Sequence, residues 1–354
     1  MKILVISLAG IGDTLLATPL FHELRRSFPD AQIDALVRWP GSRDFIENNP
    51  NLNRVFQKDL DRVSKSELWR FLMSVRREHY DASINTHPQS RIHYRLIARF
   101  IGARLRISHE YDCSGWMDRL LVNRSIPQDY TRHTVENNLA LMSFLGVHPK
   151  SAARGMEVFL TPDEEKWAQD FIDAHGLGGK KRLGIHVGSG STKNLKLKRW
   201  PLENYVRLIE RLNRERSDVT VLLFGGPEER EDHANILKRV GAPLVLQPET
   251  KNFRMAAALL KCCDAFLSVD TVMMHLAATV RVPHQIVIET PTFNKTLAPF
   301  RQPFTLVPNP AVGGRNLDYY RFDGRDIQGT REELIRFMTS VSADAVFSAL
   351  VKAI

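Results

Sequence analysis

The sequence predicts an α/β protein made of two doubly wound domains with parallel sheets. Its 354 residues exceed what one hydrophobic core usually supports. Short β-branched runs alternate with amphipathic stretches, as strands and helices do in such proteins. The alternation starts twice, each time with a strand and a glycine-containing loop, and a Gly- and Lys-rich break at 176–182 separates the two series.

The individual elements follow from the spacing of apolar residues. The first series is expected to contain strand 2–7, a helix near 14–28, strands 31–37 and 80–86, and a helix near 133–145 that Gly146 stops. The second is expected to contain strand 183–187, a helix near 202–216, and strands 219–226, 265–269 and 284–289. A last helix is expected near 331–352.

These elements give two predicted domains, residues 1–160 and 161–330. The segment 331–354 lies beyond the second series, and its helix could pack back onto the first domain. Ligands of doubly wound sheets bind outside the carboxyl ends of the strands. Functional residues are therefore expected in the loops that follow the strands.

The composition is that of a globular protein with excess positive charge. The chain has 49 basic and 40 acidic residues, a net charge of +9. This excess favours anionic partners such as phosphates, nucleic acid or a lipid headgroup surface. Because no nucleic-acid-binding signature is found, nucleic acid is not an expected partner.

The chain has the features of a cytoplasmic protein. No apolar run approaches the roughly 20 residues that span a bilayer. The apolar start at 2–7 is followed by Asp13 and is interpreted as a strand rather than a signal peptide. The three cysteines, Cys113, Cys262 and Cys263, show no metal-ligand spacing and suit a reducing compartment.

The loop after the first strand contains Gly10, Gly12 and Asp13. The glycines allow a ligand to approach the backbone, and a carboxylate at a strand end is well placed as a general base. Alternatively, Asp13 only caps the following helix. A dinucleotide-binding loop would need a third glycine where Leu15 stands, which disfavours an oxidoreductase.

The loop at 188–192 opens the second series and is rich in Gly, Ser and Thr. Lys198 and Arg199 follow it, just before Pro201, which is expected to begin a helix. Backbone N–H groups, hydroxyls and two cations at a helix start suit a diphosphate. A solvated basic loop is the alternative interpretation.

Two further strand ends carry carboxylates. Glu228 follows strand 219–226 and could accept hydrogen bonds from a ribose diol, although a Glu at a helix start is the commoner case. The other carboxylate is Asp270, which follows strand 265–269. Asp270 and Thr271 come before a helix whose first turn contains His275. A His beside Asp and Thr at a strand end is a candidate phosphate contact.

Two other patterns are weaker. Asp59 and Asp61 have the DxD form of manganese-dependent transferases, but they lie in a charged stretch that is interpreted as surface. Arg91, Arg95 and Arg99 recur at helical spacing and could bind an anionic acceptor. A solvated helix face is the alternative interpretation of this stripe.

Taken in order and at their separations, the strand-end loops resemble those of glycosyltransferase family 9, the ADP-heptose:lipopolysaccharide heptosyltransferases. The resemblance extends from residue 2 to the PTFNKTLAPF segment at 291–300. It implies the GT-B fold, in which two Rossmann-like domains face each other across a cleft. The N-terminal domain would bind the acceptor and the C-terminal domain the nucleotide sugar.

The resemblance also implies a reaction: inverting transfer of heptose, or a related sugar, from an ADP-sugar without a metal or other cofactor. The acceptor would be an anionic lipid-linked saccharide of the lipopolysaccharide inner-core type, reached from the cytoplasmic face of the inner membrane. An inverting displacement needs one base, and cations together with helix N-termini could stabilise the departing ADP.

By position in the motifs, the resemblance makes Asp13 the general base and assigns the donor to Ser191, Thr192, Lys198, Glu228 (or Glu229), Asp270, Thr271 and His275. On the acceptor side we expect Gly12, Arg91 and Arg95.

The sequence departs from the family pattern at two positions. Val272 and Thr290 stand where the family has glycine. A β-branched residue disfavours a positive φ, so the backbone at Val272 is expected to shift. The departures leave open a nucleotide-sugar-binding protein without turnover.

Overall fold

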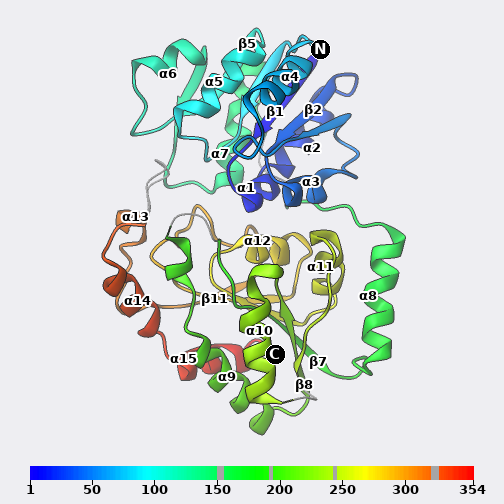
Figure 1. Ribbon diagram of the computed structural model, residues 1–354, viewed down its shortest axis with the longest axis vertical. Helices are drawn as coiled ribbons and strands as arrows, with labels where there is room; N and C mark the ends of the chain where they lie inside the picture. The colour runs from blue at the N-terminus through cyan, green and yellow to red at the C-terminus, as the bar shows by residue number, and fades with distance from the viewer. Residues whose placement is uncertain (150–154, 191–193, 242–244, 320–326) are drawn as a thin grey trace. The chain divides into compact units, whose positions relative to one another are not determined.

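The computed structural model describes residues 1–149, 155–190, 194–241, 245–319 and 327–354 (Figure 1). The chain divides into two compact units, one formed by Met1–Phe159 and one that begins at Leu160. Each unit contains a six-stranded sheet. All strand pairs in both sheets are parallel, as the alternating pattern predicted.

The strands of the first unit are β1 (Lys2–Ser7), β2 (Gln32–Val37), β3 (Arg54–Gln57), β4 (Ala82–Asn85), β5 (Leu105–Glu110) and β6 (Arg124–Pro127), in the sheet order β3-β2-β1-β4-β5-β6. The helices are α1 (Ile11–Leu16), α2 (Thr18–Ser27), α3 (Pro40–Ile46), α4 (Lys65–Arg76), α5 (Ile92–Ile101), α6 (Trp116–Leu121), α7 (Thr134–Ala140) and the 3-10 helix η1 (Leu141–Leu145).

Apolar residues on one face of the first sheet pack against α4 and α5. Leu4 and Ile6 of β1 share a cluster with Val75 of α4 and Ala98 of α5. The expected helix at 14–28 is two helices, because α1 starts at Ile11 and ends at Leu16, and α2 begins at Thr18 with a proline in its first turn. Proline is favoured in a first turn, where its missing N–H would have no helical partner.

The strands of the second unit are β7 (Lys181–His186), β8 (Val219–Phe224), β9 (Val245–Leu246), β10 (Ala265–Ser268), β11 (His284–Ile288) and β12 (Phe304–Val307), in the order β12-β11-β10-β7-β8-β9. The helices are α8 (Pro162–Ala174), η2 (Leu195–Lys198), α9 (Leu202–Glu215), η3 (Pro227–Glu229), α10 (Arg230–Val240), α11 (Phe253–Leu260), α12 (Val272–Thr279), α13 (Asn316–Tyr319), α14 (Arg331–Thr339) and α15 (Ala343–Val351).

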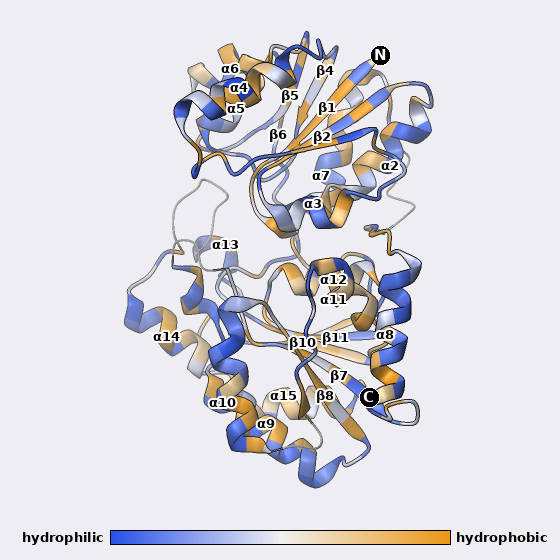
Figure 2. Cartoon of the chain, turned by 45° about the vertical axis from the view of Figure 1, so that its right-hand side comes forward, coloured by the Kyte–Doolittle hydropathy of each residue, from blue (hydrophilic) through white to orange (hydrophobic). Residues whose placement is uncertain are grey.

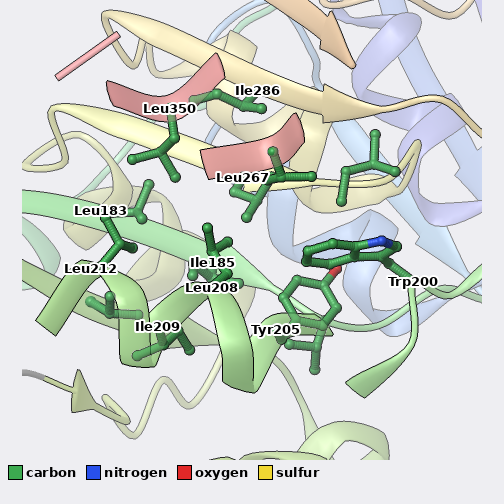
Figure 3. Packing of buried hydrophobic residues seen from close by; sticks show 14 of the residues in the cluster. Leu183, Ile185, Trp200, Tyr205, Leu208, Ile209, Leu212, Leu267, Ile286 and Leu350 are labelled. Carbon is green, nitrogen blue, oxygen red and sulfur yellow. The ribbon is translucent and has the colours of Figure 1, made fainter. Parts of the chain in front are cut away.

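The core of the second unit joins one sheet face to α9 and to the C-terminal helices (Figure 3). Ile185 of β7, Leu208 of α9 and Leu350 of α15 belong to one buried cluster. Trp200 is buried beside them, and its Nε1 donates to Val341 O at 2.8 Å. The expectation that 331–354 could pack on the first domain is therefore wrong, because the apolar side of α15 completes the core of the second unit.

Hydropathy follows this arrangement, with the sheet strands largely hydrophobic in both units (Figure 2). Within the described ranges, no single helix has the length and apolar character to cross a membrane. By length and composition alone, α14 and α15 pass that test only as a pair, bent by 44°.

Candidate functional site

The two sheets have the same order, and this order indicates where ligands bind. In each, the first strand of the unit lies between the second and the fourth, which gives the order 3-2-1-4-5-6. The winding direction therefore reverses between β1 and β4 and between β7 and β10. Doubly wound sheets bind ligands in the crevice at this reversal, outside the carboxyl ends of the strands.

In the second unit, four candidate loops follow four neighbouring strands. The sheet order places β11, β10, β7 and β8 side by side. Lys198, which precedes α9, contacts the loop after β10: its Nζ donates to Asp270 O at 2.6 Å and to Asp270 Oδ2 at 3.0 Å. Both side chains are buried. Two residues 72 positions apart in sequence thus form one ion pair at the predicted site.

Two hydroxyls from the loop after β11 complete the surroundings of Asp270. Thr290 Oγ1 donates to Asp270 Oδ1, and Thr292 Oγ1 donates to Asp270 Oδ2 at 2.6 Å. The two threonine hydroxyls lie 3.0 Å apart. A buried carboxylate is tolerated when it is paired and hydrogen-bonded. Asp270 therefore binds Lys198 while the hydroxyls of Thr290 and Thr292 fix the Asp270 carboxylate.

Arg199, the second predicted cation, is neutralised within the unit. Its guanidinium lies 3.1 Å from Glu229 and 3.1 Å from Asp232, and it also donates to Ser189 O at 3.2 Å. Two carboxylates thus surround one positive charge. The expectation that Arg199 adds free positive charge for a diphosphate is wrong, because these carboxylates take up its donors.

Glu229 and the glycines after β7 and β8 pack closely together. Glu229 Oε2 accepts from Gly226 N at 2.9 Å, and burial raises the pKa of this carboxyl. A Cβ at Gly188 would lie 2.6 Å from the Glu229 carboxyl carbon, so any larger residue there would displace this carboxylate. Glu228 is exposed instead. Of the two glutamates, Glu229 is the buried one, and it packs against the glycines that follow β7 and β8.

The helix α12 begins directly after the Asp270 loop. Thr271 is its N-cap residue, and its Oγ1 is buried with no hydrogen-bond partner among the described residues. The first N–H groups of any helix lack intrahelical partners and attract anions. His275 is buried in the first turn, as predicted. Ser191 and Thr192 lie outside the described residues.

Two buried histidines near this loop cluster were not predicted as donor contacts. His186 ends β7, and its Nδ1 lies 2.9 Å from Phe224 O. Burial lowers the pKa of His186 to about 4 and that of His233 to about 4. Both rings are therefore neutral near pH 7. Their signal in the sequence was weak, because a lone histidine beside apolar residues does not reveal its burial.

In the first unit, Asp13 lies in the short helix α1. Its Oδ2 accepts from Gly10 N at 2.6 Å, so it does cap this helix start. The next residue, Thr14, is buried and donates to Ser42 Oγ at 2.9 Å. Gly12 lies between Gly10 and Asp13 in the same turn.

The loop after β4, across the reversal from Asp13's strand, contains buried neutral groups. His87 Nδ1 lies 3.2 Å from Tyr111 Oη, which also accepts from Gln89 N at 2.9 Å. Burial lowers the pKa of His87 well below its usual value and that of His109 to about 3. The buried rings of His87 and His109 are therefore neutral near pH 7.

Comparison with known proteins agrees with this arrangement. Residues 68–309 match the family model described as glycosyltransferase family 9 (heptosyltransferase). The chain belongs to glycosyltransferase family 9. It is 24% identical over 284 residues to "Lipopolysaccharide heptosyltransferase 3" of Escherichia coli, covering 77% of this chain and 78% of that protein. It is 22% identical to "Lipopolysaccharide core heptosyltransferase OpsX" of Haemophilus influenzae, covering 79% and 76%.

Solved structures show the same fold. A glycosyltransferase family 9 structure from Veillonella parvula superposes with a TM-score of 0.78 at 21% identity, covering 99% of this chain and 96% of that chain. Escherichia coli heptosyltransferase WaaC, solved with ADP, superposes with a TM-score of 0.72 at 19% identity over the full length of both chains. The predicted GT-B fold class is confirmed, and the chain is a glycosyltransferase.

The structure of this glycosyltransferase explains its two departures from the family pattern. Val272 is the first residue of α12, and neither Val272 nor Thr290 has a positive φ. A β-branched residue fits this helical φ, and a backbone shift relative to the family's glycine stays a prediction. Thr290 contributes the hydroxyl that binds Asp270. Neither departure disturbs the loop in which it occurs.

Arg95 has a structural role in this enzyme. Its side chain is fully buried, donates to Ser90 O at 2.9 Å and forms an ion pair of 3.0 Å with Asp118. The expectation that Arg95 binds the acceptor is wrong, because the guanidinium is buried among these partners. Arg91, just before α5, is exposed.

The DxD segment of the glycosyltransferase is paired with arginine. Asp59 lies 3.5 Å from Arg38 Nε, and Asp61 also binds Arg38. This agrees with the interpretation of the segment as surface. No cluster of three or more His, Cys, Asp or Glu side chains arranged to hold a metal occurs in the ranges that the structure describes.

Proposed function

We propose that this glycosyltransferase moves heptose from an ADP-sugar to a lipopolysaccharide inner-core type acceptor, with inversion and without a metal. The observation that carries the proposal is the Lys198–Asp270 pair beside the N-terminus of α12, at the reversal of the second sheet. This combination suits a nucleoside diphosphate. It agrees with the likeness to heptosyltransferase WaaC, which was solved with ADP.

The donor diphosphate is assigned to Lys198, Thr271 and the first N–H groups of α12. An ammonium has three N–H donors, and Lys198 uses two of them on Asp270. The third is directed to a phosphate oxygen. Thr271 Oγ1, buried without a partner among the described residues, supplies a second donor. His275 in the first turn and the Gly188 loop border the same anion.

These groups also account for departure of ADP without a metal. Negative charge grows on the leaving diphosphate, and donors fixed before the reaction stabilise it most effectively. Asp270 and its two threonine partners fix Lys198 in advance. The helix terminus adds a partial positive charge that needs no reorganisation.

We assign the role of general base to Asp13. A single inverting displacement requires one base to take the proton of the acceptor hydroxyl. Asp13 follows β1 at the reversal of the first sheet, and one of its oxygens is oriented by Gly10 N. The first unit, with Gly12 and the exposed Arg91, would bind the acceptor, and the second would bind the donor.

Nucleotide binding tests this proposal directly. Thermal unfolding is measured with a panel of nucleotides and nucleotide sugars in EDTA. ADP or an ADP-sugar should give the largest shift, about 2.7 kcal/mol of stabilisation at 100 times its Kd. A strict requirement for a divalent metal, or a preference for uridine or guanosine nucleotides, would contradict the proposal.

A further inference from the structure

The short helix α6 exposes an apolar face. None of its six residues is buried. Trp116 is 73% exposed and Leu120 65% exposed, and Met117 is also largely exposed. Residues three and four positions apart lie on the same side of a helix. Three large apolar side chains therefore form one outward face, the Trp116–Met117–Leu120 face.

This face is held in a fixed orientation by the opposite side of α6. Asp118 Oδ2 accepts from Gly115 N at 2.7 Å, which caps the helix. The same carboxylate pairs with the fully buried Arg95 at 3.0 Å. Arg95 also donates to His109 O at 3.1 Å, so α6 is attached to β5 as well as to α5. The inward contacts of Asp118 hold this side of α6 against the unit and leave the apolar residues exposed.

The neighbouring helices extend the apolar surface. α6 packs beside α5, and α5 beside α4, as both ribbon views show (Figures 1 and 2). Ile92 and Leu96 of α5 are exposed. Trp69 of α4 is exposed and lies edge-on to Phe100 of α5, with 5.0 Å between ring centroids. Exposed apolar side chains on three neighbouring helices are typical of an interaction site.

Basic residues outnumber acidic residues in this part of the chain. Residues 65–127, which include α4, α5 and α6, contain eleven Arg or Lys and six Asp or Glu. Arg119 of α6 is 76% exposed, and Arg99 of α5 is exposed. Tryptophan with aliphatic residues on one side and arginines around them is typical of segments that lie in the interface of an anionic bilayer.

We infer that the Trp116–Met117–Leu120 face docks the enzyme on an anionic lipid surface. A second copy of the chain is a poorer occupant, because two identical positive surfaces repel each other. The biological purpose of the contact rests on the proposed function: a lipid-linked acceptor is presented at such a surface. Arg95, through Asp118, is the positioning residue for this contact.

Vesicle binding by the full chain tests the inference. Trp116→Ser/Leu120→Ser is compared with wild type by co-sedimentation with phosphatidylcholine vesicles containing phosphatidylglycerol. The double variant should partition at least about tenfold less, given that burying one such side chain is worth about 1.5–3 kcal/mol. Ile335→Ser, at an exposed apolar position of α14, is the matched control and should bind like wild type. Wild-type binding should also weaken with added salt and on pure phosphatidylcholine.

Three results would overturn the inference: equal partition of the double variant and wild type, equal binding of wild type to neutral vesicles, or a dimer in sedimentation velocity that only the double variant loses. Transfer to a lipid-free acceptor separates this inference from the proposed function. The double variant should retain that transfer while losing transfer to vesicle-bound acceptor. Absence of any transfer by wild type would contradict the proposed function and leave the vesicle result to decide the docking surface.

Discussion

The two sheets have the same strand order, but the groups buried at their carboxyl ends differ in charge. After β7, β8 and β10, charged side chains are buried in pairs, Lys198 with Asp270 and Arg199 with Glu229. After β4 and β5 of the first sheet, neutral groups such as His87 against Tyr111 lie in the same region as one buried pair, Arg95 with Asp118.

The difference shows that this fold supplies positions and that side chains supply the chemistry. A diphosphate carries charge and is matched by fixed cations and a helix N-terminus. A sugar hydroxyl is neutral until it reacts, and in the proposed mechanism one carboxylate, Asp13, accepts its proton. The four predictions below test this division, from the largest expected effect to the smallest.

Acid should destabilise the protein strongly, because both units bury neutral histidines. Burial holds the pKa of His109 at about 3 and those of His186 and His233 at about 4, below the value of an unfolded chain. Between pH 6.5 and 4 the unfolded chain therefore binds more protons than the folded protein. Each such histidine should lower the free energy of unfolding by about 1.4 kcal/mol per pH unit.

Urea unfolding between pH 7 and pH 4.5 measures this slope. His233→Gln should reduce it, and His148→Gln, at an exposed position, should leave it unchanged. A stability that stays flat over this range would contradict the neutral state of the buried rings in the folded protein.

Asp13→Asn should lower the transfer rate by about 100-fold or more, the usual scale for loss of a positioned base. Asn still offers an oxygen to Gly10 N, so the melting temperature should change little. The acidic limb of the pH–rate profile should disappear, and ADP affinity should be retained. Steady-state transfer, melting and ADP titration on the same variant decide the question, since near-normal turnover would leave Asp13 as a helix cap only.

Buried strands were predictable from sequence, and edge strands were not. The predicted strand 2–7 has the same bounds as β1, where five of six residues are buried. The strands β3, β6, β9 and β12 were missed; they are short and lie at sheet edges. The interior strand β5 was missed as well, and only its three middle-to-late residues 107–109 are buried. Such strands are formed by hydrogen bonding to a neighbour, which leaves no apolar pattern in the local sequence.

The sequence indicated which loops carry candidate site residues, whereas the pairings between those residues were not predictable. Lys198 and Asp270 were each expected at the donor, but only the adjacency of β7 and β10 brings them together. Arg199 was expected to bind phosphate, although the loop after β8 neutralises it. The regular spacing of arginines in α5 could not reveal that the middle one, Arg95, is buried against Asp118. Pairings between distant segments are decided by tertiary structure.

Lys198→Ala should weaken ADP binding by roughly 10- to 150-fold, because a charge-assisted contact is worth about 1.5–3 kcal/mol. Isothermal titration with ADP measures the change. Lys196→Ala is the matched control, since Lys196 lies in the same 3-10 turn but is exposed. Equal losses in the two variants would reduce Lys198 to general surface charge, and unchanged binding by Lys198→Ala would remove it from the donor site.

The smallest effect is expected at Thr290, where the family has glycine. Thr290→Ala removes the hydroxyl that donates to Asp270 Oδ1 and leaves Thr292 and Lys198 on the other oxygen. Leaving a buried acceptor unsatisfied costs about 1–3 kcal/mol, and relaxation of the loop should keep the loss near the lower end. The variant should therefore unfold at slightly lower urea concentration and bind ADP a few-fold more weakly, because Asp270 would hold Lys198 less firmly.

Thr290→Ser retains the hydroxyl and should restore both properties. If Thr290→Ala loses stability and keeps full ADP affinity, the threonine supports only the loop; if it loses affinity and Thr290→Ser restores it, the hydroxyl positions Lys198 through Asp270.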